Sequence, residues 1–229
     1  GPPQPAVADA PQPQGFGARV GDLVEGFRLV WRNRFLRFYL LFSTFSVMMG
    51  NPIVFSALPH YLSDILKLSA IAQSSAFSLY LAAASLGVGI ASLAMMFIKT
   101  TKSAPAFAPG ELSTLEKQGR WSSILHGVGW LLHLGVFFAP SLPVSIAFMA
   151  AAMLFSGFAV NIWSSLVQKV VADEAPQDMG KVYAALLFYQ LACSIAGSLL
   201  FGWIITSVPT LLALKITCGV IVFMAGLDI

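Results

Sequence analysis

Charged residues are scarce in this chain. Only 10% of its 229 residues are Asp, Glu, Lys or Arg, whereas 57% are hydrophobic. Soluble domains average about 25% charged residues, so this chain has too little charge to cover a water-facing surface. Its composition suits a surface that faces lipid, where exposed apolar side chains carry no penalty. The scarcity of charge therefore excludes an ordinary soluble domain and predicts a membrane protein.

Motifs that would carry enzyme or metal chemistry are also missing. The two cysteines, Cys193 and Cys218, lie in apolar runs without metal-ligand spacing, and each is interpreted as a buried free thiol. We find no phosphate-binding Gly-rich loop and no Gly-x-Ser-x-Gly elbow. The net charge of +3 comes from bases beside apolar segments, which favours membrane topology over nucleic-acid binding. We therefore expect no enzyme, no metal or cofactor, and no nucleic-acid partner.

Six apolar segments are long enough to cross a bilayer, which takes about 20 residues as a helix. We expect an all-α, polytopic membrane protein with spans at residues 35–58, 71–98, 121–139, 142–167, 182–207 and 210–227. Only short turns, at 140–143 and 208–209, separate the third span from the fourth and the fifth from the sixth. Both pairs are therefore predicted to form antiparallel hairpins.

Two different segments precede the first span. Residues 1–18 are rich in Pro, Ala and Gln and have no apolar core, which predicts a disordered linker rather than a signal peptide. Residues 19–34 alternate apolar residues and arginines at helical spacing, which predicts an amphipathic helix on the membrane surface. Residues 35–229 are expected to form the bundle, and the opening linker indicates a piece of a longer protein.

Positive charge falls on one side of this predicted topology. Eleven of the 13 Lys and Arg residues precede or open the first span, or lie in the second–third and fourth–fifth connections. Lys67 alone lies on the other side, and Lys215 lies inside the sixth span, where we expect it to snorkel toward the headgroups. The positive-inside rule then places both termini in the cytoplasm.

The stretches EGFRLVWRNRFLRFYLLF, ALPHYLSD and WSSLVQKVVADEAPQDMGKVYAALLF form a recognisable pattern. Together they resemble the second half of the major facilitator superfamily, in the branch that holds enterobactin exporters and macrolide efflux pumps. In that branch an EGxRxxxRN-type helix opens the seventh span and a Leu-Pro pair precedes an external loop, as in EGFRLVWRNRFLRFYLLF and ALPHYLSD here. The tenth-to-eleventh connection of that branch is similar to WSSLVQKVVADEAPQDMGKVYAALLF. The resemblance covers about residues 20–227.

The resemblance implies the C-terminal six-helix half of a twelve-helix secondary transporter. Such a protein would export a small organic molecule, such as a siderophore or a drug, across a bacterial inner membrane by alternating access. Substrate would bind between this half and a preceding six-helix half, near the midplane. Two departures concern gating: Lys181 replaces the usual Arg, and the longer second–third connection keeps only Gly119-Arg120 of the family's cytoplasmic motif. Arg120 and Lys181 are the candidate gating residues.

Polar residues inside the spans are the candidate substrate contacts. Gly50-Asn51-Pro52 interrupts the first span, and such breaks either line a transport cavity or simply kink a helix. For each candidate the alternative is a hydrogen bond between helices. The candidates are Asn51, Tyr80, Asn161, Tyr189 and Gln190.

Glycines in the second and fifth spans point to close helix packing. Gly87 and Gly89 lie in the second span, and Gly197 and Gly202 lie in the fifth. Small residues let membrane helices approach closely, so all four are predicted to sit at helix contacts.

Titratable groups inside the spans are few. His126 and His133 lie on one face of the third span, about 10 Å apart along its axis, too far to chelate one ion. They could form a proton relay, bind haem or other groups separately, or be neutral hydrogen-bonded side chains. No Asp or Glu falls inside a predicted span, because Asp228 is placed at an end, so a coupling carboxylate is expected outside this chain. The alternatives to transport are a haem-binding redox subunit and a non-transporting scaffold.

Overall fold

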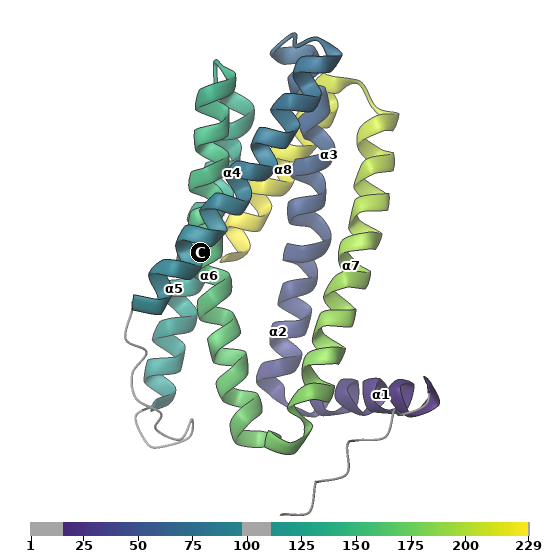
Figure 1. Cartoon of the computed structure of the whole chain (residues 1–229), viewed down its shortest axis with the longest axis vertical. Helices are drawn as coiled ribbons and strands as arrows, with labels where there is room; N and C mark the ends of the chain where they lie inside the picture. Colours follow the sequence, from purple (N-terminus) through teal and green to yellow (C-terminus); the bar gives the residue numbers. More distant parts are fainter. Residues whose placement is uncertain (1–15, 98–110, 229) are drawn as a thin grey trace, which may run out of the picture.

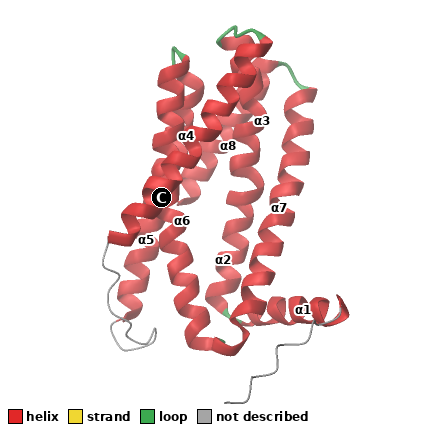
Figure 2. Ribbon diagram, viewed as in Figure 1, coloured by secondary structure: helices red, strands yellow, loops and turns green. Residues whose placement is uncertain are grey.

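The computed structural model describes residues 16–97 and 111–228, and within these ranges every element is a helix (Figure 2). Six helical segments are long and apolar enough to cross a membrane. They stand roughly parallel, and a further helix lies across one end of the bundle (Figure 1). The chain is therefore an all-α, polytopic integral membrane protein, as the composition predicts.

The elements follow the expected order. The helix at the end of the bundle, α1, spans Phe16–Arg32 and takes the place of the predicted amphipathic helix. The first span contains four consecutive segments: α2 (Arg34–Phe45), the π-helix η1 (Ser46–Gly50), α3 (Asn51–His60) and the π-helix η2 (Tyr61–Ile65). The remaining elements are α4 (Ala70–Phe97), α5 (Glu111–Phe138), α6 (Leu142–Glu174), the 3₁₀ turn η3 (Pro176–Asp178), α7 (Met179–Ser207) and α8 (Thr210–Asp228).

Several helices are longer than the apolar segments that predicted them. The first span continues to Ile65 instead of 58, α5 begins at Glu111 instead of 121, and α6 ends at Glu174 instead of 167. Hydropathy marks the part of a helix that lies in lipid, whereas the backbone hydrogen bonds continue into the polar region beyond it. Both predicted hairpin turns are confirmed, since α6 begins at Leu142 and α8 begins at Thr210. Most of the predicted linker lies outside the described residues.

The first span is interrupted where the Gly-Asn-Pro sequence predicts a break. Pro52 has no N–H to donate to the carbonyl of Met48, four residues earlier, so the α-helical ladder cannot continue through this point. The backbone instead widens into η1 over Ser46–Gly50, and α3 starts at Asn51. Single π-helical turns inside α-helices are frequent at functional sites.

The helices pack in a definite order around the interior. α6 lies between α4 and α5, α5 packs on α8, and α7 packs on η1 and α3. α1 crosses the start of α7 (Figure 1). A large apolar core fills the centre, and a smaller core joins α1, α2, α6 and α7 at the end of the bundle where α1 lies, called here the α1 end.

The outer surface is apolar, which is the reverse of a soluble protein. Large side chains on α4 and α7 are widely exposed, including Leu86 (61%), Leu199 (71%) and Trp203 (67%). Lipid can cover these side chains without penalty, whereas a patch of this kind in water would drive association.

Two of the four predicted glycine contacts are confirmed. A Cβ on Gly87 would lie 2.5 Å from the Ala150 carbonyl of α6, and a Cβ on Gly197 would lie 2.0 Å from the Met48 carbonyl of η1. Gly89 and Gly202 have nothing within 4 Å of a Cβ, so their prediction is wrong. The prediction failed for these two because the sequence shows where small residues occur but not how each helix is rotated about its axis.

Basic residues gather at the α1 end. α1, the start of α2 and the α6–α7 junction all lie there, whereas the connection that holds Lys67 lies at the opposite end (Figure 1). Lys99 and Lys102 lie outside the described residues. The segregation of charge agrees with the expected topology, and the side of the membrane that each end faces stays a prediction.

The contact between Gly197 and Met48 yields a stability prediction with an internal control. Gly197→Ala places a methyl group against backbone, and we expect a loss of about 1–3 kcal/mol, as for other overpacked sites. Gly202→Ala, five residues later on the same helix, meets open space and gains up to about 1 kcal/mol of helix propensity. Thermal unfolding of both variants in detergent measures the difference. Equal midpoints for the two variants would contradict the contact.

Candidate functional site

A polar groove lies between α3 and α7, beside the break in the first span. It has a volume of about 410 Å³, and its lining consists of Asn51, Pro52, Phe55, Ser56, Ser194 and Ser198. Asn51 and Ser198 are exposed and the two other polar residues are half-buried. Of the five predicted substrate contacts, Asn51 is the one that lines this groove.

Two further candidates join α2 to α7. The Tyr189 hydroxyl lies 2.8 Å from Oγ1 of Thr44, and Nε2 of Gln190 donates to the Tyr39 hydroxyl at 3.2 Å. These hydrogen bonds join α7 to α2, and the first span continues from α2 into α3, which lines the groove. Tyr189 and Gln190 therefore lie between the same two spans that form the groove at Asn51.

The remaining two candidates join α4 to α6. Tyr80 is fully buried, and its hydroxyl donates to Oγ of Ser145, which in turn donates to the Val136 carbonyl at 2.6 Å. Nδ2 of Asn161 donates to Oγ of Ser92 at 3.1 Å. Neither residue lines the groove. The structure thus gives Tyr80 and Asn161 the interhelical hydrogen bonds that were the alternative reading, and their contact with substrate stays a prediction.

The predicted gating residue Lys181 ties α1 to the start of α7. Its Nζ lies 2.7 Å from Glu25, 2.9 Å from Asp178 and 3.9 Å from Asp22. The helices approach so closely here that a Cβ on Gly26 would lie 2.1 Å from the Lys181 carbonyl. Lys181 and its three carboxylates are called the Lys181 cluster below.

The second predicted gating residue lies elsewhere. Arg120 is exposed on α5, a helix that takes no part in the Lys181 cluster. A further polar contact holds the α1 end together: Asn33 donates to Glu174 at the end of α6 and caps α2 by accepting from the Leu36 N–H at 2.8 Å. Asn33 lies between α1 and α2, although the sequence analysis placed it inside the predicted helix at 19–34, and its side chain could have been read as an N-cap.

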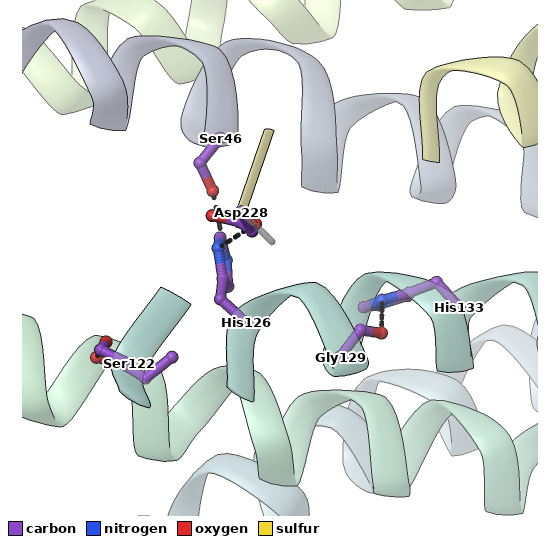
Figure 3. A network of polar contacts seen from close by, with 7 residues as sticks. Ser46, Ser122, His126, Gly129, His133 and Asp228 are labelled. Carbon is purple, nitrogen blue, oxygen red and sulfur yellow. Dashed lines mark hydrogen bonds and ion pairs between the residues drawn. The ribbon is translucent and has the colours of Figure 1, made fainter. Parts of the chain in front are cut away.

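A buried carboxylate in the membrane-spanning region belongs to Asp228. Oδ2 of Asp228 lies 2.8 Å from Nδ1 of His126, and the two side chains are 0% and 11% exposed (Figure 3). The pair is close, yet neither carboxylate oxygen has a hydrogen bond of regular geometry within the described residues. On the other side of the imidazole, Nε2 lies 3.4 Å from Oγ of Ser46, at the start of η1.

The position of Asp228 corrects the sequence analysis, which placed no carboxylate inside the bundle. α8 starts at the opposite end from α1, and its 19 residues, at about 1.5 Å each, bring Asp228 only part of the way along the 28-residue α5. The carboxylate therefore meets His126 within the bundle (Figures 1 and 3). A hydropathy window ends at the first charged residue and so treats that residue as lying outside the membrane.

The two histidines share a face of α5, as their spacing predicts. The Trp130 ring lies between them, with centroids 5.5 Å from His126 and 5.2 Å from His133. Both imidazoles are buried, and Nδ1 of His133 lies 2.9 Å from the Gly129 carbonyl of its own helix. Within 16–97 and 111–228, no group of three or more His, Cys, Asp or Glu side chains gathers as metal ligands. Lys215, expected to snorkel, is exposed on α8.

The Lys181 cluster yields a prediction about α1. Lys181→Gln removes the cation that three carboxylates share, so the α1 backbone should open more often and its amides should exchange hydrogen several times faster. Lys181→Arg keeps the charge and should preserve protection. Hydrogen exchange followed by mass spectrometry reports this for residues 22–30, and raised salt should loosen the wild type in the same way. Identical exchange in all three proteins would contradict the role of the cluster.

Comparisons of the chain with protein-family models, with curated proteins and with solved structures find no match. The resemblance to the major facilitator superfamily therefore stays a prediction that rests on the quoted stretches of sequence. The function of the chain has to be inferred from its membrane architecture and from the residues described above.

Proposed function

We propose that this chain is a six-helix half of a secondary transporter of the major facilitator type. It would export a small organic molecule, such as a siderophore or a drug, across a bacterial inner membrane by alternating access, with both termini in the cytoplasm. The observation that carries the proposal is the polar groove between α3 and α7, which is open on the side of the bundle beside a broken span.

A polar groove is an unfavourable surface to expose to lipid. A serine hydroxyl can bond to a carbonyl of its own helix, one turn earlier, and so tolerate lipid. A primary amide such as that of Asn51 has two donors and an acceptor, and burying them unpaired in hydrocarbon costs several kcal/mol, roughly. Asn51 is exposed on the bundle. This face is therefore expected to meet water, substrate or a second protein surface, as one wall of a transport cavity does.

Alternating access also requires a part that moves and a contact that opens and closes. η1 supplies a point at which the first span departs from a regular α-helix, and we infer that the span bends there. The Lys181 cluster supplies the contact, because ion pairs near a surface are weak and reversible. In the proposed transporter this cluster lies on the cytoplasmic side and stabilises one of the two conformations.

The geometry favours transport over the two alternatives. In the redox alternative, His126 and His133 would each bind haem opposite a His of another chain. Both imidazoles instead lie buried beside Trp130, and His126 has Asp228 and Ser46 as partners. A scaffold has no use for a polar groove at membrane depth.

A side chain that fills the groove should block export. We expect Ser198→Phe to lower ethidium efflux by about tenfold or more, equivalent to about 1.4 kcal/mol. Efflux is measured from loaded cells that produce the chain together with its preceding half. Ser85→Phe is the matched control, since Ser85 is an exposed serine on α4 that does not line the groove.

Three results would count against the proposal. Equal efflux in the Ser198→Phe and Ser85→Phe variants would show that the groove takes no part in transport. Efflux by the chain produced alone would show that it is not a half. Absence of six further spans from the preceding residues of the natural protein would remove the twelve-helix arrangement.

A further inference from the structure

We propose that His126 and Asp228 form a proton-binding site inside the membrane, and that the charge on this site acts on the broken first span through Ser46. Binding of the proton is independent of the proposed transport function. Its use as the coupling ion rests on that function and supplies the titratable group that the sequence analysis placed outside the chain.

The geometry gives His126 two different partners from two different elements. Nδ1 faces Oδ2 of Asp228 on α8 at 2.8 Å, and Nε2 faces Oγ of Ser46 on η1 at 3.4 Å (Figure 3). A carboxylate beside Nδ1 favours the tautomer that carries its proton there. The lone pair of Nε2 is then directed at Ser46, whose hydroxyl can donate to it.

The electrostatics favour uptake of one proton. With a neutral imidazole the pair carries a charge of −1 inside the bundle, where a carboxylate without regular hydrogen bonds is strongly unfavourable. With an imidazolium the pair is neutral overall, and the buried carboxylate has a full opposite charge beside it. The Trp130 ring lies beside the imidazole in an edge-to-face arrangement, with ring centroids 5.5 Å apart.

Other titratable groups lie on the elements that surround the pair. η1 contributes none, and on α5 His133 lies two turns from His126 and is bonded to its own helix. On α8 the nearest is Cys218, ten residues before Asp228. The rest are Arg34, Arg37 and Tyr39 on α2, Lys117 and Arg120 on α5, Lys215 on α8, His60 on α3, Tyr61 and Asp64 on η2, Lys169, Asp173 and Glu174 on α6, and Lys181, Tyr183, Tyr189 and Cys193 on α7.

The proton step involves one bond. A proton from water binds the lone pair of Nε2 and forms an N–H, and the net charge of the pair changes from −1 to zero. Ser46 then faces a donor instead of an acceptor, so its hydroxyl must turn and accept. Ser46 is the first residue of η1, the segment on which Gly197 of α7 packs. Proton release to water reverses each change.

The experiment that tests the site is nitrogen NMR of the full chain in lipid nanodiscs, with the three histidines labelled. Spectra are recorded over a range of pH from alkaline to acidic, and we expect the doubly protonated His126 ring to appear within it. Asp228→Asn keeps the shape of the side chain and removes its negative charge. In this variant, half of the His126 rings should be protonated only at a proton concentration at least about tenfold higher than in the wild type. His133→Gln is the matched control and should leave the His126 titration in place.

Each outcome of the NMR decides the proposal. A His126 ring that stays neutral throughout this range, or that titrates identically in Asp228→Asn, would overturn the proton site. Ser46→Ala separates the second part: it should change the Nε2 signal and leave the Nδ1 signal, and an unchanged Nε2 signal would refute the link to η1.

Efflux measurements separate this inference from the proposed function. If the wild type exports ethidium, His126→Gln should abolish its dependence on a pH gradient and retain downhill flux. Gradient-driven efflux in that variant would refute coupling through the site. If the wild type exports nothing while the NMR titration is observed, the transport proposal fails and the proton site stands.

Discussion

The interior of a bilayer offers no water to hydrogen-bond with, and this constraint governs every part of the chain. A backbone amide in hydrocarbon must find its partner within the protein, which is why the six apolar segments form long helices. The break at η1 is permitted because other protein surfaces cover it. In a regular α-helix the Met48 carbonyl would accept from the N–H of residue 52, but Pro52 has no N–H. Gly197 lets α7 pack directly against this carbonyl, and the Trp130 ring packs against Gly50.

The same constraint explains how the polar side chains are arranged. Tyr80, Asn161, Tyr189 and Gln190 each pair with a residue on another helix, so hydrogen bonds join α4 to α6 and α2 to α7. Asn51 is the exception, exposed in the groove. Four of the five polar side chains pair with another helix, and Asn51 alone of the five faces outward. We therefore expect the surface around Asn51 to contact something other than lipid.

The sequence predicts those features that depend on one segment at a time. Span number, hairpin turns, a helix before the first span and the break at Gly50-Asn51-Pro52 follow from hydropathy and from backbone chemistry, and the structure confirms them. Contacts between segments were less accessible. Two of four glycines meet a neighbour, because that depends on helix rotation, and the pairing of Asp228 depends on how far α8 reaches along α5. The sequence likewise did not predict the partners of Lys181, because they lie on two other elements, α1 and the turn before α7.

The two charged assemblies in the bundle differ in the solution variable to which they respond. The Lys181 cluster is partly exposed, so dissolved salt screens its ion pairs. The His126–Asp228 pair is buried, so salt screens it little, and it contains the one side-chain type that changes charge near neutral pH. In the proposed transporter, the exposed Lys181 cluster would hold one conformation closed. The buried His126–Asp228 pair would change that conformation when it binds a proton. The ion pairs of the Lys181 cluster can open without the gain or loss of a proton. The negative charge of the His126–Asp228 pair is neutralised when a proton binds. Because His126 touches α8 on one side and η1 on the other, neutralising that charge alters the forces between two spans rather than within one.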